Sequence, residues 1–398
     1  MKTPVIIAGK NYIAVNFLRY LYVNYTGQLD LYAVPNRTDT GKGGWQPSLK
    51  FEAEFLGIPV LSLAECYKIK DALFLSLEYD RIINPSKFST HKIYNIHFSK
   101  LPAYKGMYTS TWPILNGELE SGVTLHEIDL GIDTGDIVDQ CSFNIDGMTC
   151  RDLYFAYMEH AILLLKDNFD RLLKSNVQVR QQDSVGATYY SKMSIDYSDI
   201  SLNFRATAFQ VERQFRAFAF RQYQLPQFNG ISLRSARITS TKSSHKPGTI
   251  IDENQERILV ATIDYDIELG RDYLGELLMR IRSGDDIIKL LARIPEVDEL
   301  GINGWNALMV AAYYNNENAA QALIHSGADV NAVNCNGTSV LMYAKDGAEN
   351  SRDVSTLRLL LNHNANPENK DSRGLSVFDY CEQNHQKFTL NILNKYKR

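Results

Sequence analysis

The chain has 398 residues, of which 44% are hydrophobic and 22% charged, and this ordinary globular composition excludes a largely disordered protein. Its 42 basic and 46 acidic residues leave a net charge of −4, which argues against a protein that binds nucleic acid through a basic surface. The five cysteines are scattered without a CxxC pair, and no apolar run approaches the length of a membrane span. We therefore expect a cytoplasmic protein of two or three domains with no membrane segment, structural metal or nucleic-acid partner.

The first part of the chain, residues 1–187, predicts an α/β domain with a mostly parallel, Rossmann-like sheet. Its short apolar runs lie at 5–9, 29–35, 72–77 and 93–98, with candidate helices at 11–24, 48–56 and 63–69. Two further runs, 123–129 and 136–143, are separated by a short Gly-rich turn, which predicts a hairpin at one edge of the sheet. Thr149 is expected to cap a long helix whose apolar residues recur about every 3.6 positions.

The middle part, residues 188–278, predicts a small, mainly β domain. A helix-like segment at 207–218 comes first. Several short strand-like runs follow it, among them ISLRSARIT, GTII and RILVATID.

The last part, residues 279–398, contains an internal repeat. Gly304, Gly337 and Gly374 are separated by 33 and 37 residues, and a leucine precedes each of them by 14 residues. The longer interval fits an insertion near 346–353. A period of 33 residues with a Gly-containing turn and two short helices resembles the ankyrin repeat, and an unrelated helical bundle would not keep both spacings. We expect an all-α ankyrin array.

Polar residues follow two of the predicted strands. Asn95 and His97 alternate at the end of the run 93–98, so they point to the same side, at the sheet edge where α/β proteins place ligands. Asp133 lies in the turn between the two later strands. Taken singly, each has a structural interpretation, because a histidine after a strand often only supports the fold and turns favour Asp and Gly.

The two segments together are more specific. NIHFSKLPAYKG at 95–106, followed by GIDTGDI at 131–137, resembles the formyltetrahydrofolate-dependent formyltransferase family. The likeness covers about residues 1–190 and continues into the β domain that longer members carry. It implies that Asn95, His97 and Asp133 form a catalytic triad, that N10-formyltetrahydrofolate is the formyl donor and that no metal is needed.

The residue types suit that chemistry. Attack of an amine on an amide-like formyl carbonyl builds negative charge on oxygen, to which the Asn95 amide can donate a hydrogen bond. His97 can accept a proton from the amine or, when protonated, help to hold the oxyanion. Asp133 would orient the imidazole and tune its pKa. Ser99 is expected to be structural.

The resemblance also implies binding residues. The folate is expected beside the segment 76–83, although an ordinary strand end with a polar turn would look the same. The cofactor-binding candidates are Leu77, Tyr79, Arg81, Ile82 and Asp136. The substrate-binding candidates are Lys10, Asn11, Tyr104, Lys105, Gly106, Arg216, Phe220 and Tyr223. Of these, Phe220 or Tyr223 would stack on a base, and Lys10, Asn11 and Arg216 would meet phosphates.

The identity of the amine is less constrained. The basic residues Arg205, Arg213, Arg216 and Arg221 are too sparse for a tRNA and sufficient for a pyrophosphate. The segment 216–228 resembles the sugar-nucleotide N-formyltransferases. The resemblance implies a homodimer that formylates a dTDP-linked amino-dideoxyhexose, preferably dTDP-3-amino-3,6-dideoxy-D-glucose, for O-antigen synthesis. The corresponding 4-amino-4,6-dideoxyglucose remains an alternative. So does an ankyrin interaction protein with an inactive formyltransferase-like domain, although the intact triad argues against it.

The role of the repeats is also open: they could bind a partner, stabilise the enzyme or hold a ligand. Trp305 directly follows a turn glycine, where ankyrin repeats usually carry a polar exposed residue, and an exposed tryptophan commonly marks a recognition surface. One hypothesis is a second nucleotide-sugar site in which Trp305 stacks on the base. Docking against the β domain and mere chance are the alternatives.

Overall fold

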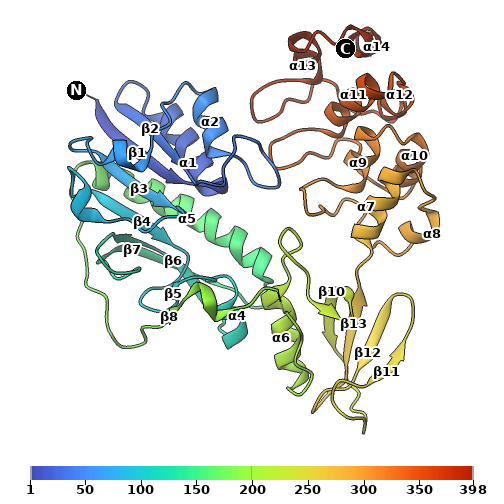
Figure 1. Cartoon of the computed structure of the whole chain (residues 1–398), viewed down its shortest axis with the longest axis horizontal. Coiled ribbons are helices and arrows are strands. Elements are labelled where there is room, and N and C mark those ends of the chain that lie inside the picture. Colours follow the sequence, from blue (N-terminus) through green and yellow to red (C-terminus); the bar gives the residue numbers. More distant parts are fainter. Residues whose placement is uncertain (1, 199, 397–398) are drawn as a thin grey trace.

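The computed structural model of the protein describes residues 2–198 and 200–396. Figure 1 shows an α/β region on one side, a small antiparallel sheet below, and a helical array that returns beside the α/β region. This architecture confirms the predicted fold class, which was an α/β domain followed by a small β domain and ankyrin repeats.

The first region is built on a six-stranded mixed sheet with the order β2-β1-β3-β4-β6-β7. The first four strands in this order run parallel, while β6 pairs antiparallel with both β4 and β7. The predicted hairpin at one edge is therefore confirmed. The strands are β1 Thr3–Gly9, β2 Leu29–Pro35, β3 Leu73–Leu77, β4 Ile93–His97, β6 Glu120–Glu127 and β7 Ile137–Asn144.

Helices cover the sheet and bury its apolar strands. The longest, α5, spans Cys150–Leu173, and Thr149 caps it in a reciprocal capping box with Asp152, as the sequence predicted. It packs against α1 and β6 in one continuous hydrophobic core. The other helices and the short strands of this region are α1 Asn11–Asn24, α2 Leu49–Phe55, α3 Leu63–Cys66, α4 Trp112–Asn116, β5 Lys105–Gly106 and β8 Tyr189–Tyr190.

The second region has its own small core. Helix α6, Ala208–Phe218, begins after a capping box at Thr207 and packs against β10 of a five-stranded antiparallel sheet with the order β11-β12-β13-β10-β9. The strands are β9 Gln227–Phe228, β10 Ile231–Ile238, β11 Ile250–Glu253, β12 Arg257–Val260 and β13 Ile267–Arg271.

The third region is a stack of short helices joined by turns. The turn glycines Gly304, Gly337 and Gly374 all adopt left-handed backbone conformations, with φ of 76°, 72° and 76°, which explains why the repeat keeps glycine there. Helix α7 shares the core of the repeats, so the predicted boundary at residue 279 falls inside that helix. The helices are α7 Leu274–Ser283, α8 Ile288–Leu291, α9 Ala307–Tyr313, α10 Glu317–His325, α11 Val340–Ser351, α12 Ser355–Asn362, α13 Val377–Gln383 and α14 Lys387–Leu393.

Across residues 2–198 and 200–396, no helix has the length and apolar character that crossing a membrane requires.

Candidate active site

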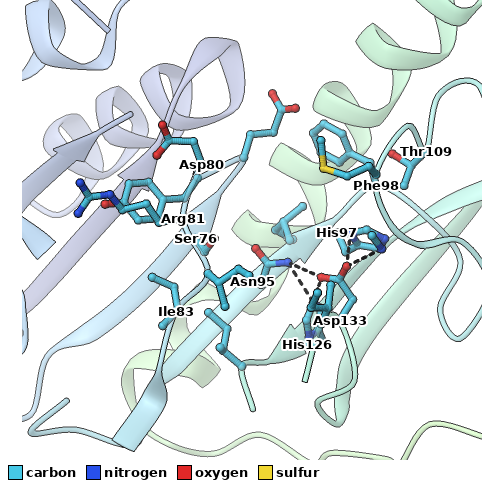
Figure 2. Close-up of a pocket in the computed structure, with 18 of the residues that line it drawn as sticks. Ser76, Asp80, Arg81, Ile83, Asn95, His97, Phe98, Thr109, His126 and Asp133 are labelled. Atoms are coloured by element: carbon cyan, nitrogen blue, oxygen red, sulfur yellow. Dashed lines mark hydrogen bonds and ion pairs between the residues drawn. The ribbon is translucent and has the colours of Figure 1, made fainter. Parts of the chain in front are cut away.

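A cavity of about 720 Å³ opens at the carboxyl ends of β3 and β4. Figure 2 shows that Asn95, His97, His126 and Asp133 converge on one side of it, while Ser76, Asp80, Arg81 and Ile83 lie on the other. The carboxyl ends of parallel strands are the usual ligand side of an open α/β sheet. The cavity is therefore the leading candidate for an active site.

Strand β4 sets the positions of Asn95 and His97. Its alternation buries Tyr94 and Ile96 in the hydrophobic core, so Asn95 and His97 both face the cavity, as the spacing predicted. The chain then leaves the strand in a loop held by Ser99, whose hydroxyl donates to the Ala103 carbonyl at 2.8 Å. Ser99 is thus structural, as expected.

Asp133 reaches the two β4 side chains from the turn between β6 and β7. Its backbone is left-handed, with φ of 54°, an uncommon conformation for a residue other than glycine. Gln182 holds this turn by donating to the carbonyls of Asp133 and Gly135 at 2.9 and 2.8 Å. The Gly106 N–H donates to the Asp133 carboxylate at 2.9 Å. The turn therefore fixes a carboxylate at the cavity wall.

The imidazole of His97 lies between two acceptors. Its Nε2 is 2.8 Å from the Tyr104 carbonyl oxygen, and its Nδ1 is 3.4 Å from the Asp133 carboxylate. A carbonyl and a carboxylate can only accept, so the doubly protonated ring is the form that satisfies both contacts. Burial alone would raise the pKa of the Asp133 carboxyl, but His97, His126 and the Gly106 N–H hold that pKa well below its usual range. Asp133 is thus an anion that can stabilise a charged imidazole.

The sequence analysis missed His126, which belongs to the same cluster. Its Nε2 is 3.0 Å from the Asn95 amide nitrogen and 3.7 Å from the Asp133 carboxylate, while its Nδ1 is 2.7 Å from the Glu127 carbonyl oxygen. Because Nδ1–H must donate to that carbonyl, Nε2 of the neutral ring can accept an N–H from Asn95. The other amide N–H of Asn95 approaches Asp133 at 3.5 Å. The β4–β6 register, which places Asn95 opposite His126, brings the pair together.

The predicted folate segment forms one wall of the cavity, but not all of its candidates face inward. Tyr79, Arg81 and Ile82 line the cavity. The structure does not bring Leu77 or Asp136 to it. The Leu77 side chain is fully buried in the hydrophobic core, and the Asp136 backbone carbonyl accepts from Glu127 on the hairpin.

Among the substrate candidates before α6, Lys10 and Gly106 line the cavity. Asn11 is buried and donates to Glu78 at 2.6 Å and to Tyr154 at 2.5 Å. The Tyr104 hydroxyl donates to Glu118 at 2.6 Å, so this side chain turns away from the cavity. Lys105 is not among the residues that line it.

The candidates on and after α6 differ in accessibility. The Tyr223 side chain is 54% exposed, whereas the Phe220 side chain is only 3% exposed and packs against Trp45, Tyr154 and Tyr223. The prediction that Phe220 stacks on a base therefore needs correction, because its ring is enclosed in the core.

The arginines of this segment already have acidic partners. Arg216 pairs with Glu212 at 2.6 Å, and Arg221 pairs with Asp272 at 2.6 Å and Glu299 at 2.7 Å. The expectation of a basic cluster open to a pyrophosphate is thus weakened for Arg216 and wrong for Arg221, which joins β13 to the repeats.

Trp305 is half-buried rather than exposed as expected. Its ring packs against Tyr313 and Tyr343, with centroid distances of 5.3 and 4.4 Å. The hypothesis of a second nucleotide-sugar site there stays a prediction.

Within residues 2–198 and 200–396, no group of three or more His, Cys, Asp or Glu side chains is placed to hold a metal ion.

Comparison with known families finds three matches. Residues 68–163 match the formyl transferase model, residues 194–272 match the model of the formyl transferase C-terminal domain, and residues 277–371 match the model of three ankyrin repeats.

Two solved structures resemble the first two regions. One is the N-formyltransferase from Helicobacter canadensis in complex with folinic acid and dTDP-3-aminofucose. It is 39% identical with a TM-score of 0.63, and the match covers 68% of this chain and 100% of that one. The other is a sugar 3N-formyl transferase solved with dTDP and 5-N-formyl-THF. It is 38% identical with a TM-score of 0.63, and the match covers 68% of this chain and 98% of that one.

Curated relatives include methionyl-tRNA formyltransferases. That of Ureaplasma parvum is 37% identical over 183 residues, which are 45% of this chain and 59% of the relative. That of Coxiella burnetii is 26% identical over 276 residues, covering 66% of this chain and 87% of the relative. The chain thus spans little more than half of the Ureaplasma protein.

Proposed function

The chain belongs to the formyltransferase family, and from this premise we propose that it transfers a formyl group from N10-formyltetrahydrofolate to the amino group of a dTDP-linked amino-dideoxyhexose. The observation that carries the reaction type is the meeting of Asn95, His97 and Asp133 at the wall of one cavity. The preferred acceptor is dTDP-3-amino-3,6-dideoxy-D-glucose, and the 4-amino isomer is the alternative.

The residues around the segment 76–83 suit a formyl-folate. Ile82 and Ile83 offer apolar surface, and Tyr79 and Arg81 offer polar groups beside it, a combination that fits a flat heteroaromatic ring with hydrogen-bonding edges. When bound, the folate would supply the one-carbon unit as an amide-like carbonyl. No metal is part of the proposal.

The triad residues and His126 have separate roles in stabilising charge and in transferring protons. The Asn95 N–H that makes only the long 3.5 Å approach to Asp133 would instead donate to the oxygen that gains negative charge, a kind of contact worth about 3–4 kcal/mol. His126 supports this role because its Nε2 accepts one Asn95 N–H and so fixes the orientation of the amide. In its neutral form His97 would accept the proton of the attacking amine, and the buried Asp133 carboxylate would stabilise the doubly protonated ring that results.

Two observations favour a nucleotide sugar over a tRNA as the acceptor. Two solved structures that are 39% and 38% identical to this chain, and are matched over 100% and 98% of their length, were solved with dTDP or a dTDP-linked sugar. In addition, the net charge of −4 does not suit the binding of a polyanion such as tRNA. We also propose that the enzyme is a cytoplasmic homodimer and that its product enters O-antigen synthesis.

An activity assay with N10-formyltetrahydrofolate tests the proposal. The acceptor panel holds dTDP-linked 3-amino and 4-amino dideoxyhexoses, with initiator methionyl-tRNA as the contrast. We expect turnover of one dTDP-amino sugar and its loss in His97→Ala. Turnover of the tRNA alone would contradict the acceptor class, and no turnover at all would favour an interaction protein with an inactive formyltransferase-like domain.

A further inference from the structure

Turns of the ankyrin array contact the catalytic domain. The turns in question are 303–305, 334–337 and 371–374, here called the finger turns. They meet the segment 37–48, which joins β2 to α2, and the first turn of α2 itself. In Figure 1 the blue segment beside α2 reaches toward the orange and red turns of the array.

Each finger turn makes a close contact. A Cβ built on Gly304 would lie 2.8 Å from the Trp45 Cα, so the two backbones touch and only glycine fits. The Cys335 thiol donates to the Gly44 carbonyl at 3.0 Å. The Arg373 guanidinium lies 4.0 Å from the centre of the Phe51 ring. Two successive repeats thus contact the segment 37–48, and the third contacts the first turn of α2 that follows it.

The other side of this segment packs against aromatic residues that follow α6, among them Tyr223, the exposed substrate-binding candidate. The Trp45 ring packs edge-on against Tyr223 at 5.3 Å and against Phe220 at 5.5 Å. The next residue, Gln46, donates to the Tyr154 hydroxyl at 3.2 Å, and that hydroxyl donates to Glu78 at 2.7 Å. Glu78 lines the catalytic cavity.

The beginning of the segment reaches the same cavity. Asn36, the residue just before it, lines the cavity and donates to the Glu78 carbonyl at 3.0 Å. Both ends of the segment therefore meet Glu78, one through Asn36 and the other through Gln46 and Tyr154. A shift of the middle of the segment would displace residues at the cavity wall, because packed side chains and hydrogen bonds transmit such displacements.

From these contacts we propose that the finger turns clamp the segment 37–48 and the first turn of α2, and that Trp45 is a positioning residue for Tyr223, the exposed candidate for binding the acceptor. The array would then be an intramolecular part of the enzyme, and its finger turns would not be free for another protein. The kinetic part of this inference rests on the proposed acceptor, whereas the clamp itself does not.

Two glycine variants of the full-length protein form a matched pair. Gly304→Ala and Gly374→Ala both place a Cβ on a residue with φ of 76°, so they share the same backbone strain. Only the first collides with Trp45, since nothing lies within 4 Å of a Cβ at Gly374. Any difference between the variants therefore reports on the clamp.

The first readout is amide hydrogen exchange over residues 37–48, which requires no activity. We expect faster exchange in Gly304→Ala than in the wild type or in Gly374→Ala. Equal exchange in the two variants would overturn the clamp.

The second readout is steady-state kinetics. We expect Gly304→Ala to raise the KM for the dTDP-amino sugar about two- to thirtyfold, with the KM for N10-formyltetrahydrofolate unchanged and Gly374→Ala close to wild type. Trp45→Leu removes the ring that packs against Tyr223 and should raise the same KM, which keeps the test available if Gly304→Ala folds poorly. Faster exchange with an unchanged acceptor KM would overturn the positioning role. Failure of the wild type to use any dTDP-amino sugar would instead refute the proposed function, and the exchange experiment would still decide the clamp.

Discussion

Replacing Asp133 with asparagine removes the charge at the centre of the site while keeping the shape of the side chain. If the new carbonyl oxygen keeps the place that accepts the Gly106 N–H and faces His97, the new NH₂ group takes the place of the oxygen that lies near His126 and the Asn95 amide. His97 then faces a neutral oxygen instead of an anion. One or two charge-assisted contacts are therefore lost, at about 1.5–3 kcal/mol each. If both act in the transition state, kcat falls about 10- to 10⁴-fold, at tenfold for each ~1.4 kcal/mol.

The assay for Asp133→Asn is the initial rate of formylation of the dTDP-amino sugar at saturating N10-formyltetrahydrofolate. Asp133→Glu keeps the charge on a longer side chain and serves as the comparison for geometry alone. A kcat within about twofold of the wild type would refute the assignment of the carboxylate to proton handling at His97.

The same substitution makes a separate prediction about stability. Because the folded-state pKa of Asp133 is lowered, its ionised form stabilises the fold above the unfolded-state pKa of about 4, and this contribution disappears as pH falls further. The free energy of unfolding should therefore differ between wild type and Asp133→Asn by a constant amount at neutral pH, and by less below about pH 4. Denaturant titrations at several pH values measure this difference, and a difference that stays the same as the pH falls below about 4 would contradict the lowered pKa.

Three further predictions concern other parts of the molecule. His126→Phe removes the acceptor that orients Asn95, so kcat should fall about 10- to 100-fold while circular dichroism stays native, and an unchanged kcat would exclude the role. Arg221→Ala leaves Asp272 and Glu299 without their partner and should lower the free energy of unfolding by about 3–5 kcal/mol, which denaturant titration will show or exclude. If Trp305 belongs to a second nucleotide-sugar site, Trp305→Ala will change the shape of the curve of rate against sugar concentration, and an unchanged shape counts against that site.

Local sequence signals were sufficient to predict most of the helices and strands. The Thr149 cap, the alternation in β4 and the glycine spacing of the repeats each follow from interactions within a few residues of chain, and the structure has them where the sequence placed them. The family motif likewise named Asn95, His97 and Asp133, and the structure brings these three side chains together.

The place of His126 in the catalytic cluster depends on strand pairing and could not be predicted from the sequence. His126 sits in an apolar run that reads as an ordinary strand, and only the antiparallel register between β4 and β6 places it opposite Asn95. The surroundings of Phe220 and Arg221 likewise depend on tertiary contacts. The enclosing ring of Trp45 and the acidic partners of Arg221 come from distant segments, so composition near residue 220 could not reveal that both side chains are already occupied.

The sequence by itself determined the class of each region and the residue types of the triad, because periodicity, capping and motif spacing are local properties of the chain. Only the tertiary structure decided which side chains share the cavity with that triad. It also decided that the finger turns of the repeats contact the segment 37–48 and the first turn of α2, and these contacts join residues about 260 to 320 positions apart in the chain. No local pattern encodes such a contact, since it depends on how three regions with separate hydrophobic cores pack together.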